Sequence, residues 1–409
     1  MPSTYRARNV IFAEHELEVP LDHDRPDGER LTIFARELAD PDGRDKPFLV
    51  FFEGGPGHEP PRGTRSSRAW IDRALGEFRV LLLDQRGTGR STPVGALRGM
   101  TPSEQAEYLT HFRADSIVRD AELLREALGA DRWSVLGQSF GGLCVTAYLS
   151  IAPDGLKEAL ITAGLPPLRR PLEDVYRSTW AGTAERNRRY FDRYGDDRAR
   201  MLALVERLER EPLRLPSGDP LTPRRLRQAG SVLGMSYGAE QLHGLLELPA
   251  DSPAFLHDAE AATNFARNPL YAIIHEACWA DGVATRWAAS RTMPELFASQ
   301  PEFLYGEHVF PWMFEEVGEL APLREAADLL AAVEWPRLYD EDVLRANDVP
   351  CAAAIWTDDL YVPREFSEET AALIRRLRPW LTNEYDHDGL RDDGARIFSR
   401  LLDLARGRA

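Results

Sequence analysis

One short motif constrains the fold of this 409-residue chain more than any other feature. Gly137, Ser139 and Gly141 form a G-x-S-x-G sequence, preceded by the apolar run Trp133 to Leu136 and followed by the apolar run Leu143 to Leu149. The two runs predict a strand and a helix, and the glycines allow a sharp turn between them that exposes the Ser139 hydroxyl above a sheet. The alternative is a chance occurrence of the motif in a tight turn. The context favours a nucleophilic serine.

Strands and helices alternate through the first 166 residues, which is typical of an α/β fold with a mostly parallel central sheet covered on both faces. Apolar residues spaced three or four apart predict one helix, with Ile117, Ala121, Leu124 and Leu128 on its buried face and Gly129 at its end. The candidate strands are Leu31 to Ala35, Pro47 to Phe52, Arg79 to Leu83, Trp133 to Leu136 and Ala159 to Thr162.

From Pro167 the pattern changes to long helical stretches rich in Arg and Glu, with no clear strand before Val349. Cys351 to Trp356 is then a short apolar run, and two amphipathic helices are expected after it. Their apolar positions are Phe366, Leu373 and Leu377 in one helix, and Ile397, Leu401 and Leu404 in the other. Because the last segment is too small to build a core alone, we expect residues 1–166 and 345–409 to form one domain that carries residues 167–344 as an inserted helical cap.

The composition indicates which kinds of partner the protein can have and in which cellular compartment it is expected. Lys and Arg number 50 against 66 Asp and Glu, giving a net charge of −16, which argues against a nucleic-acid partner. Cys144, Cys278 and Cys351 are far apart and suggest neither a disulfide framework nor a zinc site. The chain contains no run of 18 apolar residues and no apolar segment of the kind a secretory signal needs. We therefore expect a cytoplasmic protein without a membrane partner.

Two further motifs resemble a cofactor site and a metal site, but each lacks one residue that the site requires. The glycines at Gly87 and Gly89 would begin a dinucleotide-binding fingerprint, but Thr92 stands where its last glycine belongs. A structural turn supporting the site is expected there. His275 and Glu276 would begin a zinc-binding helix, but position 279 is Trp279. No cofactor and no metal are expected.

A nucleophilic serine of this type needs a carboxylate and then a histidine, in that chain order. Only His387, in a polar loop, lies in the returning α/β segment. The acid is expected at the end of the strand over Cys351 to Thr357, where Asp358 and Asp359 are adjacent. Successive side chains of an extended chain point in opposite directions, so one of them faces His387, and the pattern does not choose between them. The other histidines are His15, His23, His58 and His111 before the serine and His243, His257, His275 and His308 in the helical part.

An oxyanion hole requires two backbone N–H groups near the serine. The N–H of Phe140, at the start of the helix after Ser139, is one candidate. The Gly-rich turn from Gly54 to Gly57, directly after a predicted strand, would supply the second.

Together these residues resemble the proline iminopeptidases, or prolyl aminopeptidases, of the α/β-hydrolase fold. The resemblance rests on five matches, which are G-G-P-G at 54–57, D-Q-R-G-x-G-x-S at 84–91, G-x-S-x-G-G at 137–142, D-x-x-x-P at 359–363, and the late His387. It implies a serine exopeptidase that releases N-terminal proline from small peptides through a prolyl-enzyme intermediate. It also implies a triad of Ser139, Asp359 and His387, with Gly55 and Phe140 N–H groups as the oxyanion hole.

The same resemblance implies that glutamates of the cap bind the charged N-terminus of the substrate, because a buried ammonium needs carboxylate partners. Glu276 resembles the first such position and Glu307 is chosen for the second, with Glu315 and Glu316 as rivals. Aromatic residues are frequent between 271 and 315, which suits an apolar slot for a proline ring, although packing of the cap would explain them too.

One position departs from the family pattern. Many members have histidine before G-G-P-G, where this chain has Glu53, and the carboxylate is expected either to pair with Arg86 or Arg90 or to touch the substrate amine. Two other functions stay open. The first is an esterase, lactonase or amidase acting on small acyl substrates, and the second is a catalytically idle ligand sensor. An aspartate-nucleophile dehalogenase or epoxide hydrolase is disfavoured by Ser139. The sequence gives no oligomeric state.

Overall fold

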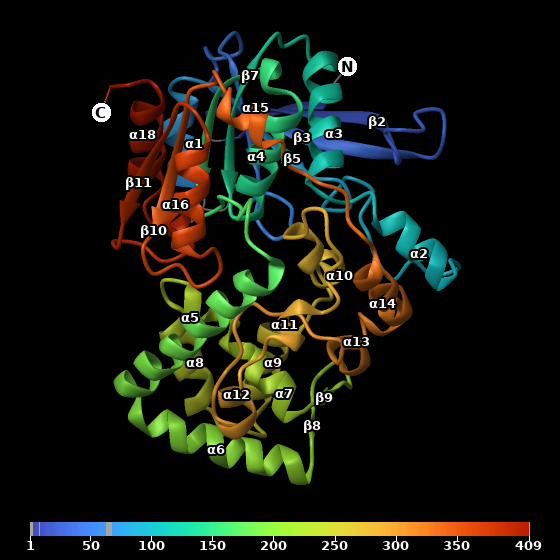
Figure 1. The fold of residues 1–409 in the computed structure, drawn as a ribbon, viewed down its shortest axis with the longest axis vertical. Helices are drawn as coiled ribbons and strands as arrows, with labels where there is room; N and C mark the ends of the chain where they lie inside the picture. The colour runs from blue at the N-terminus through green and yellow to red at the C-terminus, as the bar shows by residue number, and fades with distance from the viewer. Residues whose placement is uncertain (1–2, 8, 63–67, 409) are drawn as a thin grey trace.

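The computed structural model describes residues 3–7, 9–62 and 68–408, and a nine-stranded sheet lies at its centre (Figure 1). In spatial order the strands are β1 (Ser3–Ala7), β2 (Val10–Pro20), β3 (Arg30–Ala39), β5 (Arg79–Asp84), β4 (Phe48–Phe52), β6 (Trp133–Gln138), β7 (Leu156–Thr162), β10 (Cys351–Trp356) and β11 (Leu377–Thr382). The first four are joined by antiparallel pairings, and β5 through β11 are parallel. The predicted α/β class with a mostly parallel sheet is confirmed.

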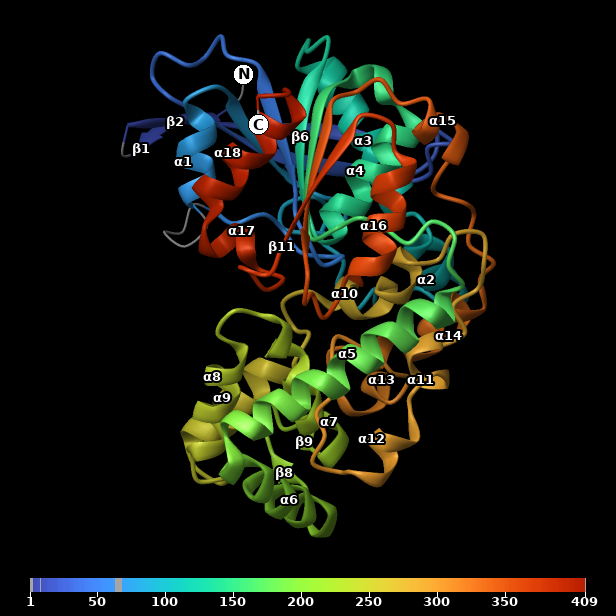
Figure 2. The ribbon, with the colours of Figure 1, turned by 60° about the vertical axis from the view of Figure 1, so that its left-hand side comes forward.

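The two faces of the sheet belong to two hydrophobic clusters, as alternating side chains require. On β4, Leu49 and Phe51 join one cluster, whereas Val50 and Phe52 join the other. The first face is covered by α1 (Arg68–Leu75) and α18 (Gly394–Ala405). The second is covered by α3 (Ala114–Ala127), α4 (Phe140–Ile151) and α16 (Arg364–Leu373), and Figure 2 shows the two sets on opposite sides. Burial on both faces explains why the central parallel strands are almost wholly apolar.

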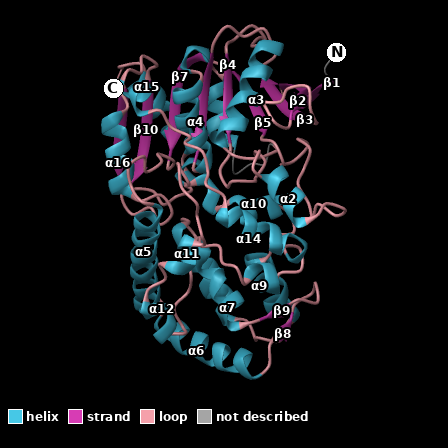
Figure 3. Cartoon of the chain, turned by 45° about the vertical axis from the view of Figure 1, so that its right-hand side comes forward, coloured by secondary structure: helices cyan, strands magenta, loops and turns pink. Residues whose placement is uncertain are grey.

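The chain between β7 and β10, residues 163–350, is here termed the helical segment. Most of its helices gather at one end of the sheet, where Figure 3 shows helix and loop with one small pair of strands. Helix α15 (Glu341–Arg345) lies apart from them and packs against α4 and α16. The helices are α5 (Leu172–Arg193), α6 (Gly195–Arg210), α7 (Pro223–Arg227), α8 (Gly238–Glu247), α9 (Pro253–Thr263), α10 (Pro269–Ile274), α11 (Ala288–Arg291), α12 (Glu295–Ser299), α13 (Met313–Glu316), α14 (Arg324–Ala332) and α15 (Glu341–Arg345). The expected domain division at 166/167 and 344/345 stays a prediction.

All five strands predicted in the first 166 residues are present, each within a few residues of the expected bounds. The predicted helix from Ile117 is α3, and Gly129 follows its end with a φ of 66°. Two further helices of the sheet region are α2 (Pro102–Leu109) and α17 (Gly389–Asp392).

Two local predictions are wrong, and two strands at the start of the chain were missed. Leu377 begins β11 and does not continue the helix of Phe366, because α16 ends at Leu373. The helical segment contains two short strands, β8 (Leu213–Arg214) and β9 (Pro220–Leu221), which pair in the proline-rich stretch. Strands β1 and β2 were not predicted. They extend the antiparallel edge of the sheet, where a partly exposed strand such as β2 lacks a continuous apolar run.

Candidate active site

Ser139 lies at the sharp turn between β6 and α4, with φ 55° and ψ −123°. A positive φ is uncommon for a residue with a side chain and marks local strain of a kind found at functional sites. The turn is tightly packed, because a Cβ atom on Gly141 would lie 1.9 Å from the carbonyl oxygen of Phe52. The backbone N–H of Ser139 donates to the carbonyl oxygen of Thr162 over 2.9 Å. The strand, turn and helix expected around Ser139 are thus present, with its side chain half-buried.

Asp359 and His387 are in direct contact. The Nδ1 atom of His387 lies 3.0 Å from Oδ1 and 2.9 Å from Oδ2 of Asp359. Oδ1 of Asp359 also accepts hydrogen bonds from the backbone N–H groups of Tyr361 and Val362, at 2.9 and 3.1 Å. The neighbouring Asp358 has an exposed carboxylate that pairs with Arg189. Of the two adjacent aspartates, the structure therefore brings Asp359 to the histidine.

The pKa of His387 is shifted upward. Burial alone would lower it, but the hydrogen-bonded carboxylate of Asp359, together with Glu307 and Asp388, outweighs burial and raises it above 6.5. Only 6% of the His387 side chain and 2% of the Asp359 side chain are exposed, so the attraction between them is little screened. The arrangement stabilises an imidazolium, which is the state a catalytic base reaches after taking a proton.

The backbone of His387 is held from two sides. Its carbonyl oxygen accepts a 3.1 Å hydrogen bond from Nε2 of Gln138, the residue before Ser139. Its N–H donates over 3.1 Å to the carbonyl oxygen of Gly234 in the helical segment. The ring of Tyr361 stands edge-on to the imidazole, with 4.7 Å between ring centroids. These contacts connect His387 to the strand that precedes Ser139 and to the helical segment.

The Gly-rich turn after β4 lies against the serine. A Cβ atom on Gly54 would lie 3.1 Å from Cβ of Ser139. The N–H of Gly54 donates over 2.9 Å to the carboxylate of Glu53. The next N–H along the chain, that of Gly55, is therefore the one at this turn that suits an oxyanion. Phe140 is the first residue of α4, where backbone N–H groups have no partner inside the helix.

Glu53 is buried and pairs with neither Arg86 nor Arg90, so that alternative is wrong, whereas a contact of Glu53 with the substrate amine stays a prediction. Arg86 instead binds Asp120, and Arg90 binds two surface glutamates of β2. Oε1 of Glu53 lies 3.8 Å from Nη2 of Arg391 in α17. Burial raises the pKa of Glu53, while Arg391 and the Gly54 N–H act against that rise.

The turn following β5 has the supporting role expected from the sequence. The side chain of Gln85 donates over 3.0 Å to the carbonyl oxygen of Glu53. The peptide group between Glu53 and Gly54 is thus bound on both sides, through its carbonyl oxygen and its N–H. This fixes the plane of the peptide that precedes the Gly55 donor.

Glu307 lies near enough to His387 for its charge to raise the pKa of the imidazole. Its Oε1 accepts a 2.7 Å hydrogen bond from the hydroxyl of Tyr271, and its Oε2 lies 3.8 Å from Nε2 of His275. Burial would raise the pKa of Glu307, but His275, His387 and Tyr271 lower it below its usual value. Glu307 therefore stays ionised at neutral pH beside the base.

Glu276 is buried in a different setting. Its two carboxylate oxygens accept hydrogen bonds from the N–H groups of Ala288 and Ala289, at 3.1 and 2.9 Å. Burial raises its pKa to about 7, and these backbone donors and Thr285 limit the rise. The carboxylate thus secures the start of α11.

The two rival glutamates have partners elsewhere. Glu315 pairs with Arg324 at 2.8 Å, and Glu316 pairs with Arg224 and accepts from Thr222, both at 2.6 Å. Glu307, by contrast, is one of the charges that raise the pKa of His387.

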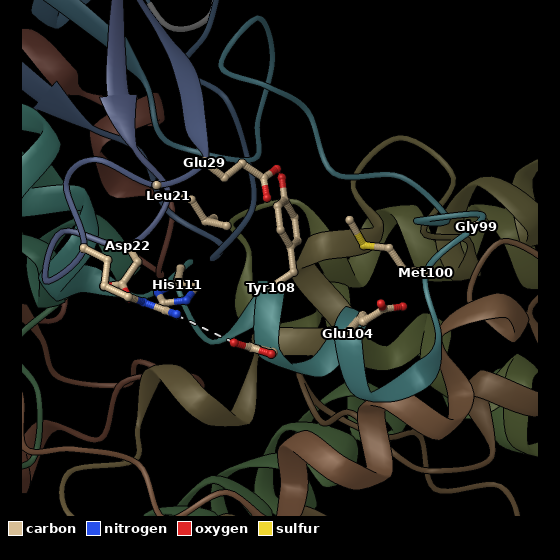
Figure 4. A pocket seen from close by; sticks show the side chains of 11 residues that line it. Leu21, Asp22, Glu29, Gly99, Met100, Glu104, Tyr108 and His111 are labelled. Atoms are coloured by element: carbon tan, nitrogen blue, oxygen red, sulfur yellow. Dashed lines mark hydrogen bonds and ion pairs between the residues drawn. The ribbon is translucent and has the colours of Figure 1, made fainter.

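A cavity of about 240 Å³ opens beside Glu307, and its lining includes His58, Tyr271 and Phe265. A larger one of about 440 Å³ lies between the β2–β3 connection and α2 (Figure 4). Its lining includes the charged side chains of Asp22, Glu29 and Glu104 and none of the residues predicted for the site. Of these two cavities, the first is the one with a predicted site residue, Glu307, in its lining.

Several supporting residues were not identified from the sequence. Tyr361 packs on the imidazole, Gln138 binds its loop, and Tyr271 binds Glu307. Two of them lie inside motifs already noted, Gln138 within G-x-S-x-G and Tyr361 within D-x-x-x-P. Motif membership was therefore the available signal, whereas Tyr271 carried none beyond its aromatic character.

Within residues 3–7, 9–62 and 68–408, no group of three or more His, Cys, Asp or Glu side chains is placed to hold a metal ion. No helix in the described part of the chain is both long and apolar enough to cross a membrane. Cys144, Cys278 and Cys351 are free and buried.

Comparison with known proteins gives three findings. A family model described as the α/β hydrolase fold matches residues 47–394. A proline iminopeptidase from Aeromonas sobria is 47% identical over 421 residues, which cover 99% of each chain. Proline iminopeptidase aneH from Aspergillus aculeatus is 31% identical over 425 residues, covering 97% of this chain and 94% of the relative. Both similarities therefore extend over the sheet and the helical segment together.

Proposed function

The chain belongs to the proline iminopeptidase family of α/β hydrolases. We propose that Ser139, Asp359 and His387 form the catalytic triad with which it releases N-terminal proline from peptides. The enzyme is a prolyl aminopeptidase. The observation that carries the assignment is the position of Glu307, an ionised carboxylate that acts on the buried His387. An anion beside a catalytic base suits a substrate whose free ammonium lies one residue from the bond to be cleaved.

In the proposed mechanism Ser139 is the nucleophile and His387 the base. His387 takes the proton from the Ser139 hydroxyl as the oxygen attacks the prolyl carbonyl carbon. Asp359 keeps the imidazole oriented and stabilises its charged form. His387 then gives the proton to the leaving amine, and water hydrolyses the prolyl-enzyme by the same sequence of proton transfers.

The oxyanion formed in each step is assigned to the N–H groups of Gly55 and Phe140. Support comes from the position of the Gly-rich turn against Ser139 and from the occupied N–H of Gly54. Preorganised backbone donors of this kind cost no reorganisation during the reaction.

The charged N-terminus of the substrate is assigned to Glu307, with Glu276 as the second carboxylate. The two differ in ionisation, because the pKa of Glu307 is lowered and that of Glu276 is raised to about 7. At neutral pH the stronger and more constant charge is that of Glu307. The cavity beside it is the proposed place for the proline ring.

Two broader assignments are also proposals. The division into an α/β core of residues 1–166 and 345–409 and a helical cap of residues 167–344 is supported by the sheet resuming at β10. A cytoplasmic location is supported by the three free cysteines.

One substrate panel tests the proposed function. Release of a chromogenic amine is measured from proline, alanine and N-blocked proline conjugates, together with a simple ester. We expect rapid turnover of the free proline conjugate and little of the blocked one. Equal turnover of the blocked conjugate would exclude an aminopeptidase, ester cleavage alone would indicate an esterase, and no turnover of any substrate would indicate a ligand sensor.

A further inference from the structure

Helix α5 of the helical segment lies along the two loops that carry the acid and the base. Figure 1 and Figure 3 both place α5 next to the ends of β10 and α16. The approach is close, because a Cβ atom on Gly182 would lie 3.3 Å from Cδ1 of Leu360. One turn before Gly182, the hydroxyl of Ser178 donates over 2.7 Å to the carboxylate of Glu365.

Arg186, one turn further along α5, contacts both loops at once. Its Nη2 atom donates over 2.8 Å to the carbonyl oxygen of Asp358 and also donates to the carboxylate of Asp386. Asp358 precedes Asp359, and Asp386 precedes His387. A single guanidinium group therefore joins the residue before the acid to the residue before the base. Only 20% of the Arg186 side chain is exposed.

The charges around this contact explain why a cation is needed. Asp386 lies near two other carboxylates, those of Asp388 and Asp359, and His387 additionally faces Glu307. Burial raises the pKa of Asp386, and Arg186 is the cation that acts against the rise. Neighbouring carboxylates repel one another. Without the guanidinium group, this repulsion would push the loop that carries Asp359 away from the loop that carries His387.

We propose that Arg186 is a positioning residue, which holds the loops of Asp359 and His387 at the separation required for their hydrogen bond. Arg186 does not reach the reacting atoms and acts through the two loops. The proposal rests on the proposed function in taking Ser139, Asp359 and His387 as the catalytic triad. It goes beyond that function in making a residue of the helical segment part of the triad's support.

The chain provides a matched control in Arg189. This residue lies almost one turn after Arg186 on the same helix and also contacts Asp358, with 3.2 Å between Nη1 and Oδ2. Its side chain is 53% exposed, and its second partner is Glu185 on α5 itself. Arg189 thus resembles Arg186 in charge, helix and one partner, but it makes no contact with the base loop.

The test compares Arg186→Ala, Arg186→Lys and Arg189→Ala in the full chain, with kcat and KM measured on the chromogenic proline conjugate. We expect Arg186→Ala to lower kcat by about 10- to 100-fold, the size of effect that a small misplacement of catalytic groups produces. Its KM should change by less than about threefold, because substrate-binding groups are untouched. Arg186→Lys should recover most of kcat, and Arg189→Ala should keep the wild-type value.

A second measurement separates this proposal from the proposed function. The rate at which a fluorophosphonate labels Ser139 reports on the activated serine and requires no peptide substrate. We expect slower labelling in Arg186→Ala even if the wild-type enzyme prefers a substrate other than a prolyl peptide. Equal kcat and equal labelling rates in Arg186→Ala and Arg189→Ala would overturn the positioning role. A loss that tracks a lower melting temperature and is not recovered by Arg186→Lys would overturn it as well.

Discussion

The imidazole of His387 binds both carboxylate oxygens of Asp359 through the same nitrogen, Nδ1, at 3.0 and 2.9 Å. A carboxylate only accepts hydrogen bonds, so Nδ1 carries the hydrogen and Nε2 is left free to receive a proton. The orientation of the ring and its tautomer are therefore both determined by one aspartate. This relationship leads directly to the first prediction.

Asp359→Asn should lower kcat by about 10⁴-fold with little change in overall structure, because the amide can donate to Nδ1 and favour the wrong tautomer. Steady-state kinetics on the proline conjugate measure the effect. Asp358→Asn is the matched control, since its exposed carboxylate binds only Arg189. Comparable losses in both variants would contradict the assignment of Asp359.

The pH dependence of kcat/KM should show an acidic limb centred above pH 6.5. The pKa of His387 is raised above 6.5, so the neutral base that the reaction needs is lost as pH falls through that higher value. A rate profile from pH 5 to 9 measures the midpoint. Glu307→Gln should move the midpoint to lower pH, because it removes one of the negative charges that raise this pKa. A wild-type midpoint below 6.5 would disagree with the geometry.

Glu307→Gln should lower kcat/KM by about 10- to 100-fold for substrates with a free N-terminus, which corresponds to one lost charge-assisted hydrogen bond. A simple ester without an amine should be affected much less, and the ratio of the two substrates is the measurement. Glu315→Gln is the control, because its carboxylate pairs with Arg324. An equal loss on both substrates would mean that Glu307 does not recognise the amine.

Glu276 should make the protein less stable as pH rises. Its folded-state pKa is about 7 against an ordinary 4.5, so the folded state holds the proton more tightly between these values. The contribution of Glu276 to the free energy of unfolding should therefore fall from pH 4.5 to pH 7, by about 3 kcal/mol for a shift of this size. Urea unfolding at pH 5 and pH 8 measures it. The decline should be smaller in Glu276→Gln, and an unchanged decline would refute the attribution to Glu276.

Glu53→Ala should reduce kcat more than Glu53→Gln. Glutamine can still accept the N–H of Gly54, whereas alanine leaves that buried donor without a partner and frees the turn next to Gly55. The loss in the alanine variant should stay below the roughly 100- to 1000-fold that follows removal of an oxyanion donor itself. Single-turnover kinetics of acylation measure the step concerned. Equal rates in the two variants would show that the hydrogen bond to Gly54 does not matter.

The parts of the fold that could be predicted are those with strong local patterns. Strands β4 and β5 are buried almost throughout, so each appears as a nearly continuous apolar run. Strand β11 lies at the edge of the sheet, contains Pro379 and is largely exposed, and its first residue matched a helical spacing. The sequence pattern there could not distinguish a strand from the continuation of a helix.

The candidate site likewise has parts that the sequence pattern could predict and parts that it could not. Chain order and the strand ends were enough to predict that His387 meets one of the two aspartates after β10, but the predicted arginine partners of Glu53 are wrong. Arg391 comes from α17, a helix of only four residues that no periodicity could reveal. Long-range charge pairs of this type depend on how separate loops pack, which a sequence pattern does not encode.

The two backbone hydrogen bonds of His387 have a practical consequence for engineering. One ties the base to Gln138 in the nucleophile strand and the other to Gly234 in the helical segment. Replacing the helical segment with that of a relative, in order to alter substrate preference, would also change the anchor of the base. Such chimaeras should therefore differ in turnover as well as in selectivity, unless the stretch around Gly234 is transplanted so that it meets the loop of His387 in the same way.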